Sequence, residues 1–196
     1  MKKNIPHLIT FSRLILAPTF LALLLSANSS PKYDEFAIGS LWLCYFLIEI
    51  SDLLDGYLAR KLHSVTEFGK IFDPFADSLS RLTAFLGFLL IGQMPVWIFV
   101  VIFYRDLIIS FLRMILAGQG LVQGARLTGK IKAWVYALTN IVALLTFSAK
   151  RALILMPFFD ILNILNLVFF ISAAGIAVIS GLDYLSFFIK RQPKTS

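Results

Sequence analysis

Cysteine and histidine are almost absent from this chain. Among its 196 residues there is one cysteine, Cys44, and there are two histidines, His7 and His63. A lone cysteine excludes an intrachain disulfide, so packing among apolar neighbours is the role we expect for Cys44. The two histidines stand near the ends of apolar segments with nothing at metal-ligand spacing, and we interpret them as interfacial residues.

Charged residues are also scarce, at 15% of the chain, whereas 59% of the residues are hydrophobic. The mean hydropathy of +0.84 is far above that of a soluble domain. Apolar segments close to the roughly 20 residues that a membrane-spanning helix needs occur six times. They are residues 8–28, 36–59, 72–92, 95–117, 130–149 and 161–189. The sequence therefore predicts an all-α polytopic membrane protein with six transmembrane helices in one bundle.

Long linkers, internal repeats and low-complexity stretches are missing as well, so we expect one domain over residues 1–196. In the last apolar segment, Ala173, Ala177 and Gly181 recur every four residues. Such a face of small residues lets helices approach closely. We expect it to serve packing within the bundle, with contact between two copies in a homodimer as the alternative.

The net charge of +7 would suggest nucleic-acid binding in a soluble protein, but here the basic residues gather at one set of segment ends. That set holds Lys2, Lys3, Arg13, Arg60, Lys61, Lys70, Arg126, Lys130, Lys132, Lys190, Arg191 and Lys194, and the other set holds only Lys32, Lys150 and Arg151. Basic residues favour the cytoplasmic side of a membrane. We therefore predict a multi-pass protein of the inner (cytoplasmic) membrane, with both termini in the cytoplasm and no nucleic-acid partner.

Four aspartates, Asp52, Asp55, Asp73 and Asp77, lie at the facing ends of the second and third apolar segments, on the predicted cytoplasmic side. Carboxylates gathered at a membrane segment repel one another and lose hydration, which calls for a compensating cation. Oxygen ligands without histidine or cysteine favour Mg²⁺, Mn²⁺ or Ca²⁺ over zinc. The sequence thus predicts a divalent metal site, with Mg²⁺ first and Mn²⁺ as the substitute, and a cluster of salt bridges to nearby arginines and lysines is the alternative.

Helical spacing shapes the surroundings of these carboxylates. On a helix, positions 52, 55, 56 and 59 share one face, so Gly56 and Ala59 leave bare backbone beside Asp52 and Asp55. Asp73 precedes Pro74, which suits a helix cap followed by the first helical residue. Asp77 then lies one turn further on, and both carboxylates can face the first pair.

Eight residues in this region spell D-x2-D-G-x2-A-R-x8-G-x3-D-x3-D. This pattern resembles, at every fixed position, the signature of the CDP-alcohol phosphatidyltransferases. The resemblance implies an enzyme that binds a CDP-linked lipid and lets an alcohol hydroxyl attack its β-phosphoryl group to release CMP. By position it implies that Asp52, Asp55, Asp73 and Asp77 hold the metal and that Asp77 is also the general base. The residues implied for the CDP moiety are Gly56, Ala59, Arg60 and Gly69.

The signature leaves the acceptor alcohol open. A phosphate-bearing acceptor requires cations near the acidic site. The candidates are Arg105, Arg113, Arg126, Lys130 and Lys132, and we predict that Arg105, Arg113, Lys130 and Lys132 bind the phosphate. Arginine inside an apolar helix generally faces a polar cavity, and its planar fork suits a phosphate. Arg105 is followed by Asp106, so an internal ion pair is the competing interpretation there.

Outside the signature, the chain is similar to the branch of this family that uses sn-glycerol 3-phosphate and makes phosphatidylglycerophosphate. The likeness covers roughly residues 4 to 132, including Asn4, Pro6, Thr10, Arg13, Arg105, Asp106, Arg113, Lys130 and Lys132. Three residues depart from that branch: His7, Ser78 and Ala133, and Ser78 replaces a lysine that usually follows the last aspartate. Arg81, one turn on, can supply the missing cation.

The expected reaction is therefore transfer of the phosphatidyl group from CDP-diacylglycerol to glycerol 3-phosphate. The departures keep two other acceptors open, inositol phosphate and an uncharged alcohol. A metal or cation transporter could also hold four intramembrane aspartates, but it would not require the Gly-x2-Ala-Arg strip, and the chain shows no pair of broken helices in matching halves.

Overall fold

The chain folds as an all-α protein, as predicted. The computed structural model describes the backbone of residues 5–30, 35–61, 67–118, 127–152 and 158–191. It also describes the side chains of these residues, except at positions 5–10, 52–61, 67–71, 73, 74, 117, 118, 190 and 191. Its helices are α1 (Ile5–Ser29), α2 (Glu35–Lys61), α3 (Glu67–Leu90), α4 (Val96–Gly118), α5 (Leu127–Ala152) and α6 (Phe159–Arg191). Each predicted apolar segment corresponds to one of these helices.

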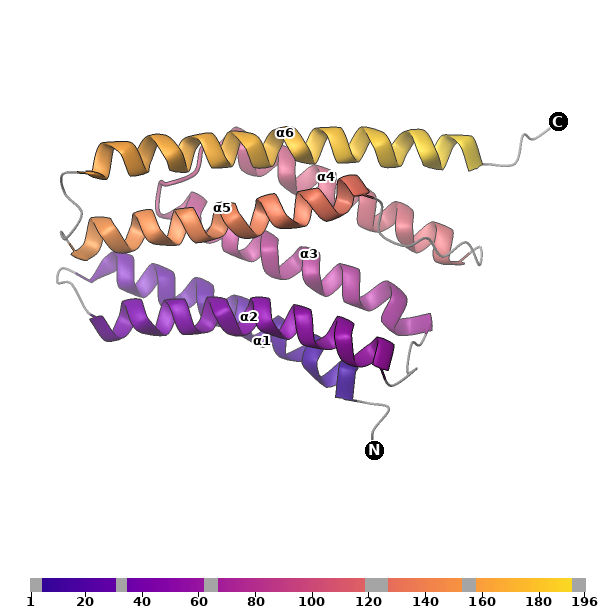
Figure 1. Cartoon of the computed structure of the whole chain (residues 1–196), viewed down its shortest axis with the longest axis horizontal. Coiled ribbons are helices and arrows are strands. Elements are labelled where there is room, and N and C mark those ends of the chain that lie inside the picture. Colours follow the sequence, from indigo (N-terminus) through magenta and orange to yellow (C-terminus); the bar gives the residue numbers. More distant parts are fainter. Residues whose placement is uncertain (1–4, 31–34, 62–66, 119–126, 153–157, 192–196) are drawn as a thin grey trace.

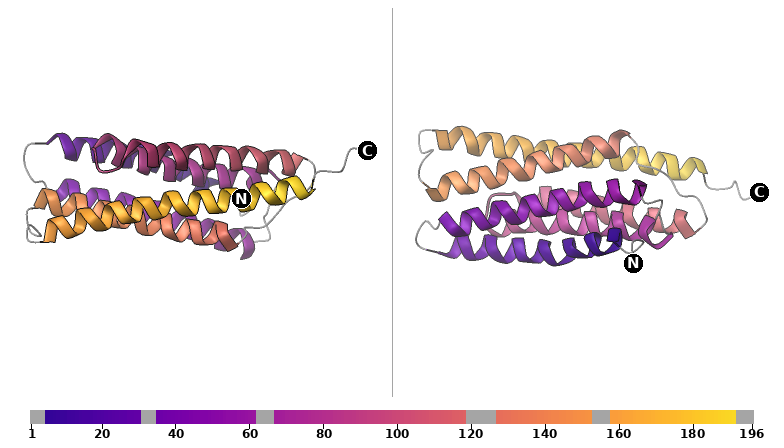
Figure 2. Two further views of the ribbon diagram at one scale, coloured as in Figure 1. Left: turned by 90° about the horizontal axis from the view of Figure 1, so that it is seen from above. Right: turned by 60° about the horizontal axis from the view of Figure 1, so that its bottom comes forward.

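The helices lie side by side and alternate in direction (Figures 1 and 2). The starts of α1, α3 and α5 and the ends of α2, α4 and α6 gather at one end of the bundle, on the right in Figure 1. We call this the motif end, because the last turns of α2 and the first turns of α3 carry the acidic signature. α1 packs against α2 and α3, α3 against α4, and α6 against α4 and α5.

A tight turn at the opposite end sets α4 beside α3. Gly92 adopts a left-handed conformation with φ of 76°, which glycine reaches without steric cost. The amide groups of Gln93 and Met94 donate to the carbonyl oxygen of Phe88 at 2.9 and 3.2 Å, so they satisfy an acceptor left free at the helix end. The chain therefore reverses within a few residues.

A cluster of aromatic rings on α3, α5 and α6 forms part of the core, to which all six helices contribute. Phe85 stacks edge-on against Tyr136 with ring centroids 5.1 Å apart, and Phe170 lies 6.3 Å from both Phe85 and Phe88. Ala173 and Ala177 are fully buried in the same cluster. The small-residue face of α6 is thus used inside the chain, as expected.

Cys44 is buried in the core, as predicted for a packing residue. Its sulfur atom donates to the carbonyl oxygen of Leu16 on α1, 3.4 Å away. It therefore supports the contact between α1 and α2.

Many large apolar side chains face outward, among them Ile15, Trp97, Trp134, Ile164 and Leu182, and lipid is the solvent that favours such a surface. Within the described residues, three helical stretches are long and apolar enough to cross a membrane: Phe11–Ser29, Leu127–Ala152 and Phe159–Ile189. In α4 three charged residues, Arg105, Asp106 and Arg113, interrupt the apolar sequence, and the side chains of α2 and α3 are described only in part. Six spans therefore remain a prediction, whereas a membrane-embedded helical protein agrees with the structure.

Candidate functional site

The backbone brings the four signature aspartates to the motif end. Asp52 and Asp55 lie in the last three turns of α2, and Asp73 and Asp77 lie in α3, four residues apart and therefore on one face. Asp73 was expected to cap a helix, but α3 already begins at Glu67, so that expectation was wrong. The helix extends back past Pro74, even though proline cannot donate a backbone hydrogen bond there.

Seven of the eight signature residues lie outside the part of the chain whose side chains the structure describes. They are Asp52, Asp55, Gly56, Ala59, Arg60, Gly69 and Asp73. Their convergence around a metal and the CDP moiety stays a prediction. The side chain of the eighth, Asp77, is described.

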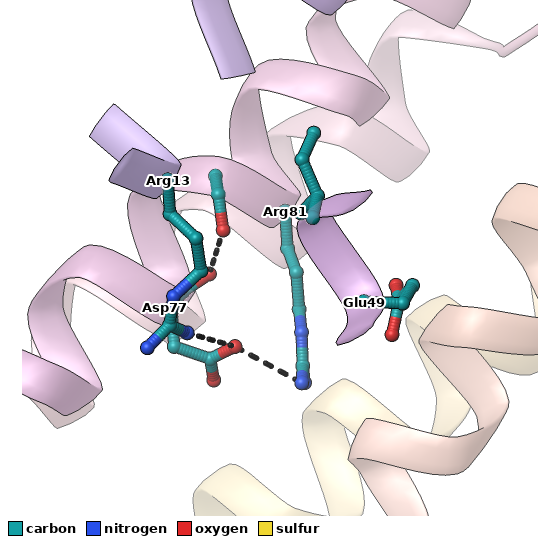
Figure 3. Close-up of a pocket in the computed structure, with 6 residues that line it drawn as sticks. Arg13, Glu49, Asp77 and Arg81 are labelled. Atoms are coloured by element: carbon teal, nitrogen blue, oxygen red, sulfur yellow. Dashed lines mark hydrogen bonds and ion pairs between the residues drawn. The ribbon is translucent and has the colours of Figure 1, made fainter. Parts of the chain in front are cut away.

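Asp77 lies between two arginines from different helices (Figure 3). Its Oδ1 is 3.0 Å from Nη2 of Arg81 and 3.8 Å from Nη1 of Arg13 on α1. The Arg13 side chain is 1% exposed, whereas that of Asp77 is 29% exposed, so the carboxylate is open on one side. Arg81 thus supplies a cation beside Asp77, where Ser78 stands in place of the usual lysine.

A cavity of about 220 Å³ opens on the other side of Asp77. Residues of α3, α4 and α5 line it: Asp77, Ser78, Arg81, Arg105, Asp106, Ile109, Ser110, Arg113, Gly129, Lys130, Lys132 and Ala133. All four predicted acceptor-phosphate residues are in this set, together with the predicted base. Five basic side chains and two carboxylates around one cavity make it suited to an anion.

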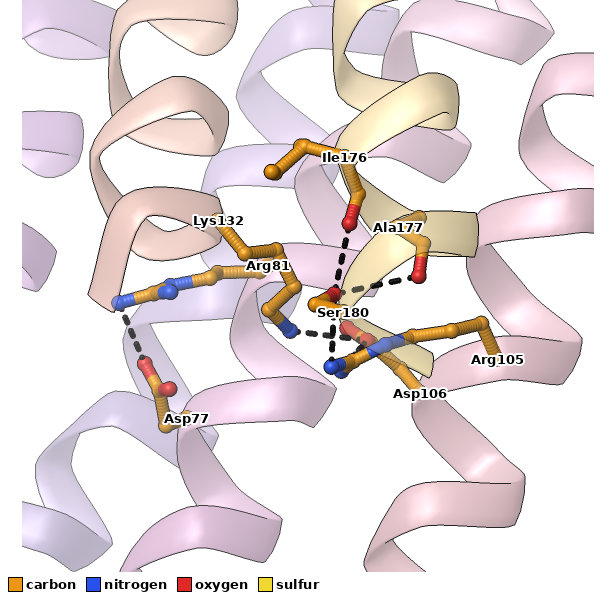
Figure 4. Close-up of polar contacts among 8 residues, drawn as sticks. All are labelled: Asp77, Arg81, Arg105, Asp106, Lys132, Ile176, Ala177 and Ser180. Atoms are coloured by element: carbon orange, nitrogen blue, oxygen red, sulfur yellow. Dashed lines mark hydrogen bonds and ion pairs between the residues drawn. The ribbon is translucent and has the colours of Figure 1, made fainter. Parts of the chain in front are cut away.

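The floor of the cavity is an ion-pair network (Figure 4). Oδ1 of Asp106 accepts from Nη1 of Arg105 at 2.7 Å and from Nζ of Lys132 at 2.8 Å. Lys132 also lies 4.7 Å from the ring centroid of Tyr136. The internal Arg105–Asp106 pair considered as an alternative is therefore present, and both partners still line the cavity.

Arg113 and Lys130 lie on the cavity wall. The Arg113 guanidinium lies 5.6 Å from the ring centroid of Tyr184 on α6, and such a cation–π contact orients its planar group. Lys130 is exposed at the start of α5. Two residues before it, Thr128 donates to Oδ2 of Asp183 at 2.7 Å, which ties α5 to α6 at this end.

The described part of the site contains one of the four predicted metal ligands, Asp77. Within it, no three carboxylate, histidine or cysteine side chains converge. Asp77, the one described member of the predicted ligand set, is partly exposed and lines the cavity, so it is accessible to a bound ion. A set made of carboxylates alone fits Mg²⁺ or Mn²⁺.

Sequence reasoning missed three contributors to this site: Asp106 as the shared partner of two cations, Ser180 as a contact of Arg105, and Tyr184 as a contact of Arg113. The adjacent charges of Arg105 and Asp106 in an apolar helix were a signal for the first. Ser180 and Tyr184 belong to another helix, and their pairing with α4 depends on packing that no local pattern encodes.

Comparison with known proteins gives a match to the family model for CDP-alcohol phosphatidyltransferase over residues 3–182. A CDP-diacylglycerol–glycerol-3-phosphate 3-phosphatidyltransferase of Bacillus subtilis is 33% identical over 189 residues, covering 93% of this chain and 94% of that protein. An enzyme of the same name from Treponema pallidum is 44% identical over 94 residues, covering 48% of this chain and 44% of that protein. A probable phosphatidylglycerophosphate synthase of Mycobacterium tuberculosis is 30% identical over 183 residues, covering 93% of this chain and 80% of that protein.

Proposed function

Since the chain belongs to the CDP-alcohol phosphatidyltransferase family, we propose that it transfers the phosphatidyl group of CDP-diacylglycerol to sn-glycerol 3-phosphate, giving phosphatidylglycerophosphate and CMP. The similar enzymes of Bacillus subtilis and Treponema pallidum carry the name of this reaction. Family membership also makes an enzyme a better interpretation than a cation transporter.

The observation that carries the acceptor assignment is the cavity beside Asp77. Arg105, Arg113, Lys130 and Lys132 line it with the proposed base. An acceptor whose phosphate contacts these cations keeps its hydroxyl end free to reach Asp77. An uncharged alcohol would leave the excess positive charge of this wall without an anion to balance it, and charged groups in an apolar bundle are costly unless they serve a polar ligand.

In the proposed reaction, a hydroxyl oxygen of the acceptor forms a bond to the β-phosphorus of CDP-diacylglycerol. The bond from that phosphorus to the bridging oxygen breaks, and CMP leaves with the bonding electrons. Asp77 accepts the hydroxyl proton as the new bond forms. Arg81 and Arg13, which both contact Oδ1 of Asp77, orient the carboxylate for this step.

The donor end of the site rests on the signature. We infer that Asp52, Asp55, Asp73 and Asp77 hold Mg²⁺ or Mn²⁺, and that Gly56, Ala59, Arg60 and Gly69 contact the CDP moiety. When bound, the metal neutralises charge on the pyrophosphate and the leaving CMP. The position of the aspartates in α2 and α3 at the motif end supports this assignment.

The test is CMP release by the purified protein in detergent or vesicles, with CDP-diacylglycerol and four acceptors side by side: glycerol 3-phosphate, inositol phosphate, serine and glycerol. We expect a clear preference for glycerol 3-phosphate. Preference for inositol phosphate would keep the reaction and change the acceptor. Preference for an uncharged alcohol would remove the role proposed for the basic cavity.

We further infer that all six helices cross the inner membrane, with both termini and the active site in the cytoplasm. The alternating helix directions and the lysines and arginines at the motif end support this orientation. A homodimer stays a prediction, and the small-residue face of α6 is not free for it, because Ala173 and Ala177 are buried within the chain.

A further inference from the structure

We propose that Asp106, Ser180 and Gly181 are positioning residues that fix Arg105 and Lys132 at the floor of the cavity and thereby set the affinity for a phosphorylated acceptor. This inference rests on the proposed function, since it concerns the phosphate of the acceptor in that reaction. None of the three residues belongs to the signature.

Asp106 does not have the geometry of a base or a ligand. Its side chain is fully buried, and its Oδ1 is already shared by Arg105 and Lys132. Its Oδ2 is buried and has no hydrogen-bond partner among the described residues. The carboxylate therefore acts on the two cations beside it and not on a substrate.

The two cations need this restraint. The side chains of Arg105 and Lys132 are each 10% exposed, and they come from neighbouring helices, α4 and α5. Without the shared carboxylate, two like charges would be close together in a poorly hydrated place and would repel one another. With the carboxylate present, Arg105 and Lys132 are both held at hydrogen-bond distance from Oδ1 of Asp106. Two cations and one carboxylate leave a net positive charge that can attract an anion.

α6 holds Arg105 from the other side. Nη2 of Arg105 donates to Oγ of Ser180 at 3.0 Å, and that hydroxyl is oriented by the carbonyl oxygens of Ile176 and Ala177 at 2.7 and 3.1 Å (Figure 4). At the next residue, a Cβ added to Gly181 would lie 3.2 Å from Cγ of Arg105. Glycine there lets the arginine stem pass close to the helix backbone.

The first experiment is a double-mutant cycle on KM for glycerol 3-phosphate, with Asp106→Asn, Lys132→Met and the double variant. Asp106→Asn adds positive charge to the cavity, so simple attraction would lower KM, whereas loss of positioning raises it. We expect KM to rise about tenfold, as for one charge-assisted hydrogen bond lost. We also expect kcat and the KM for CDP-diacylglycerol to change much less. In the Lys132→Met background, Asp106→Asn should raise the KM for glycerol 3-phosphate by a smaller factor than it does in the wild type. A lowered KM, or an undiminished factor in that background, would overturn the inference.

The second experiment changes no charge and remains decisive if Asp106→Asn does not fold. Gly181→Ala pushes directly on Arg105, whereas Gly175→Ala, on the same helix, meets nothing within 4 Å and is the matched control. We expect a higher KM for glycerol 3-phosphate in the first and the wild-type value in the second. Equal KM values in both variants and the wild type would contradict positioning through Gly181.

The wild-type protein separates this inference from the proposed function. If it prefers another phosphorylated alcohol, the proposed acceptor is wrong, and the same variants are compared with that alcohol. If it transfers only to an uncharged alcohol, both fail. If it uses glycerol 3-phosphate and the variants behave like wild type, only the positioning role fails.

Discussion

Asp77 is shared between an ion-pair site and an open cavity. Arg13 and Arg81 contact one of its oxygens, while the residue also lines the space where the acceptor is proposed to bind. This arrangement suits a carboxylate that must stay oriented and still meet a substrate hydroxyl.

Replacing Asp77 by asparagine should remove transfer while some CDP-diacylglycerol binding remains. An amide cannot take the hydroxyl proton, and loss of general-base catalysis typically costs about 10²- to 10⁴-fold in rate. The measurement is CMP release at saturating substrates, together with a binding assay for CDP-diacylglycerol. The control is Asp160→Asn, since Asp160 is an exposed residue at the start of α6, at the end of the bundle opposite the motif end. Near-normal turnover of the Asp77 variant would refute the base assignment.

Chelation of divalent metal by EDTA should abolish the reaction, and added Mg²⁺ or Mn²⁺ should restore it. Asp52→Asn should weaken metal-dependent binding of CDP as well as turnover, because the metal is proposed to contact the pyrophosphate. Isothermal titration with CDP, with and without Mg²⁺, measures the binding part. Activity that survives EDTA would remove the metal from the mechanism.

Arg113→Ala should raise the KM for glycerol 3-phosphate by about tenfold or more. Each charge-assisted hydrogen bond to the phosphate is worth about 1.5–3 kcal/mol, and 1.4 kcal/mol is a factor of ten. The KM for CDP-diacylglycerol should change much less. Lys150→Ala removes an exposed cation at the opposite end of the bundle and is the control. An unchanged KM for the acceptor would mean that Arg113 only packs against Tyr184.

At the scale of helices, α3 connects the two parts of the site. It carries Asp77 and Arg81 at the motif end, and further along it packs Phe85 and Phe88 against α5 and α6. Those two helices carry Lys132 and Ser180 of the cavity floor. The aromatic contacts therefore hold the base and the phosphate-binding cations in one frame.

Phe85→Ala should destabilise the protein by about 3 kcal/mol, the lower end for a buried Phe→Ala change. The lower end applies because lipid is as apolar as the core, so packing is the main loss. Denaturation in detergent, followed by circular dichroism, measures the effect. Phe111→Ala removes a ring that is 55% exposed and should change stability far less. Equal effects of the two substitutions would argue against a core role for Phe85.

For the whole molecule, the alternating helices place most of the basic residues of the described segments towards the motif end, with Lys150 and Arg151 at the other end. A bilayer favours such a distribution on its cytoplasmic side. The exposed apolar side chains along the helices agree with a bundle whose outer surface faces lipid.

Topology can be tested by cysteine labelling in a Cys44→Ser background. Lys2→Cys and Lys194→Cys should be protected from an impermeant thiol reagent in intact cells, because both lie on the proposed cytoplasmic side. Ser29→Cys, at the exposed end of α1 opposite the motif end, should be labelled and serves as the positive control. Labelling of either terminal cysteine from outside would reverse or break the proposed topology.

The sequence by itself determined the all-α fold, the helix positions and the family. Apolar segments of spanning length and the spacing of the signature residues are local properties, which a single chain displays without any partner. The same locality explains the error at Asp73, since the Asp-Pro pair predicted a helix start that the structure has several residues earlier.

Only the tertiary structure decided which polar residues meet. Arg81, Arg105, Arg113 and Lys132 were candidates spread over three helices, and packing alone brought them to one cavity beside Asp77. The contacts of Asp106 with Lys132, of Ser180 with Arg105 and of Tyr184 with Arg113 emerged in the same way, because a contact between helices depends on their rotation and approach. Those are set by the burial of Phe85, Phe170 and Ala177 elsewhere in the bundle, and not by any pattern near the charged residues themselves.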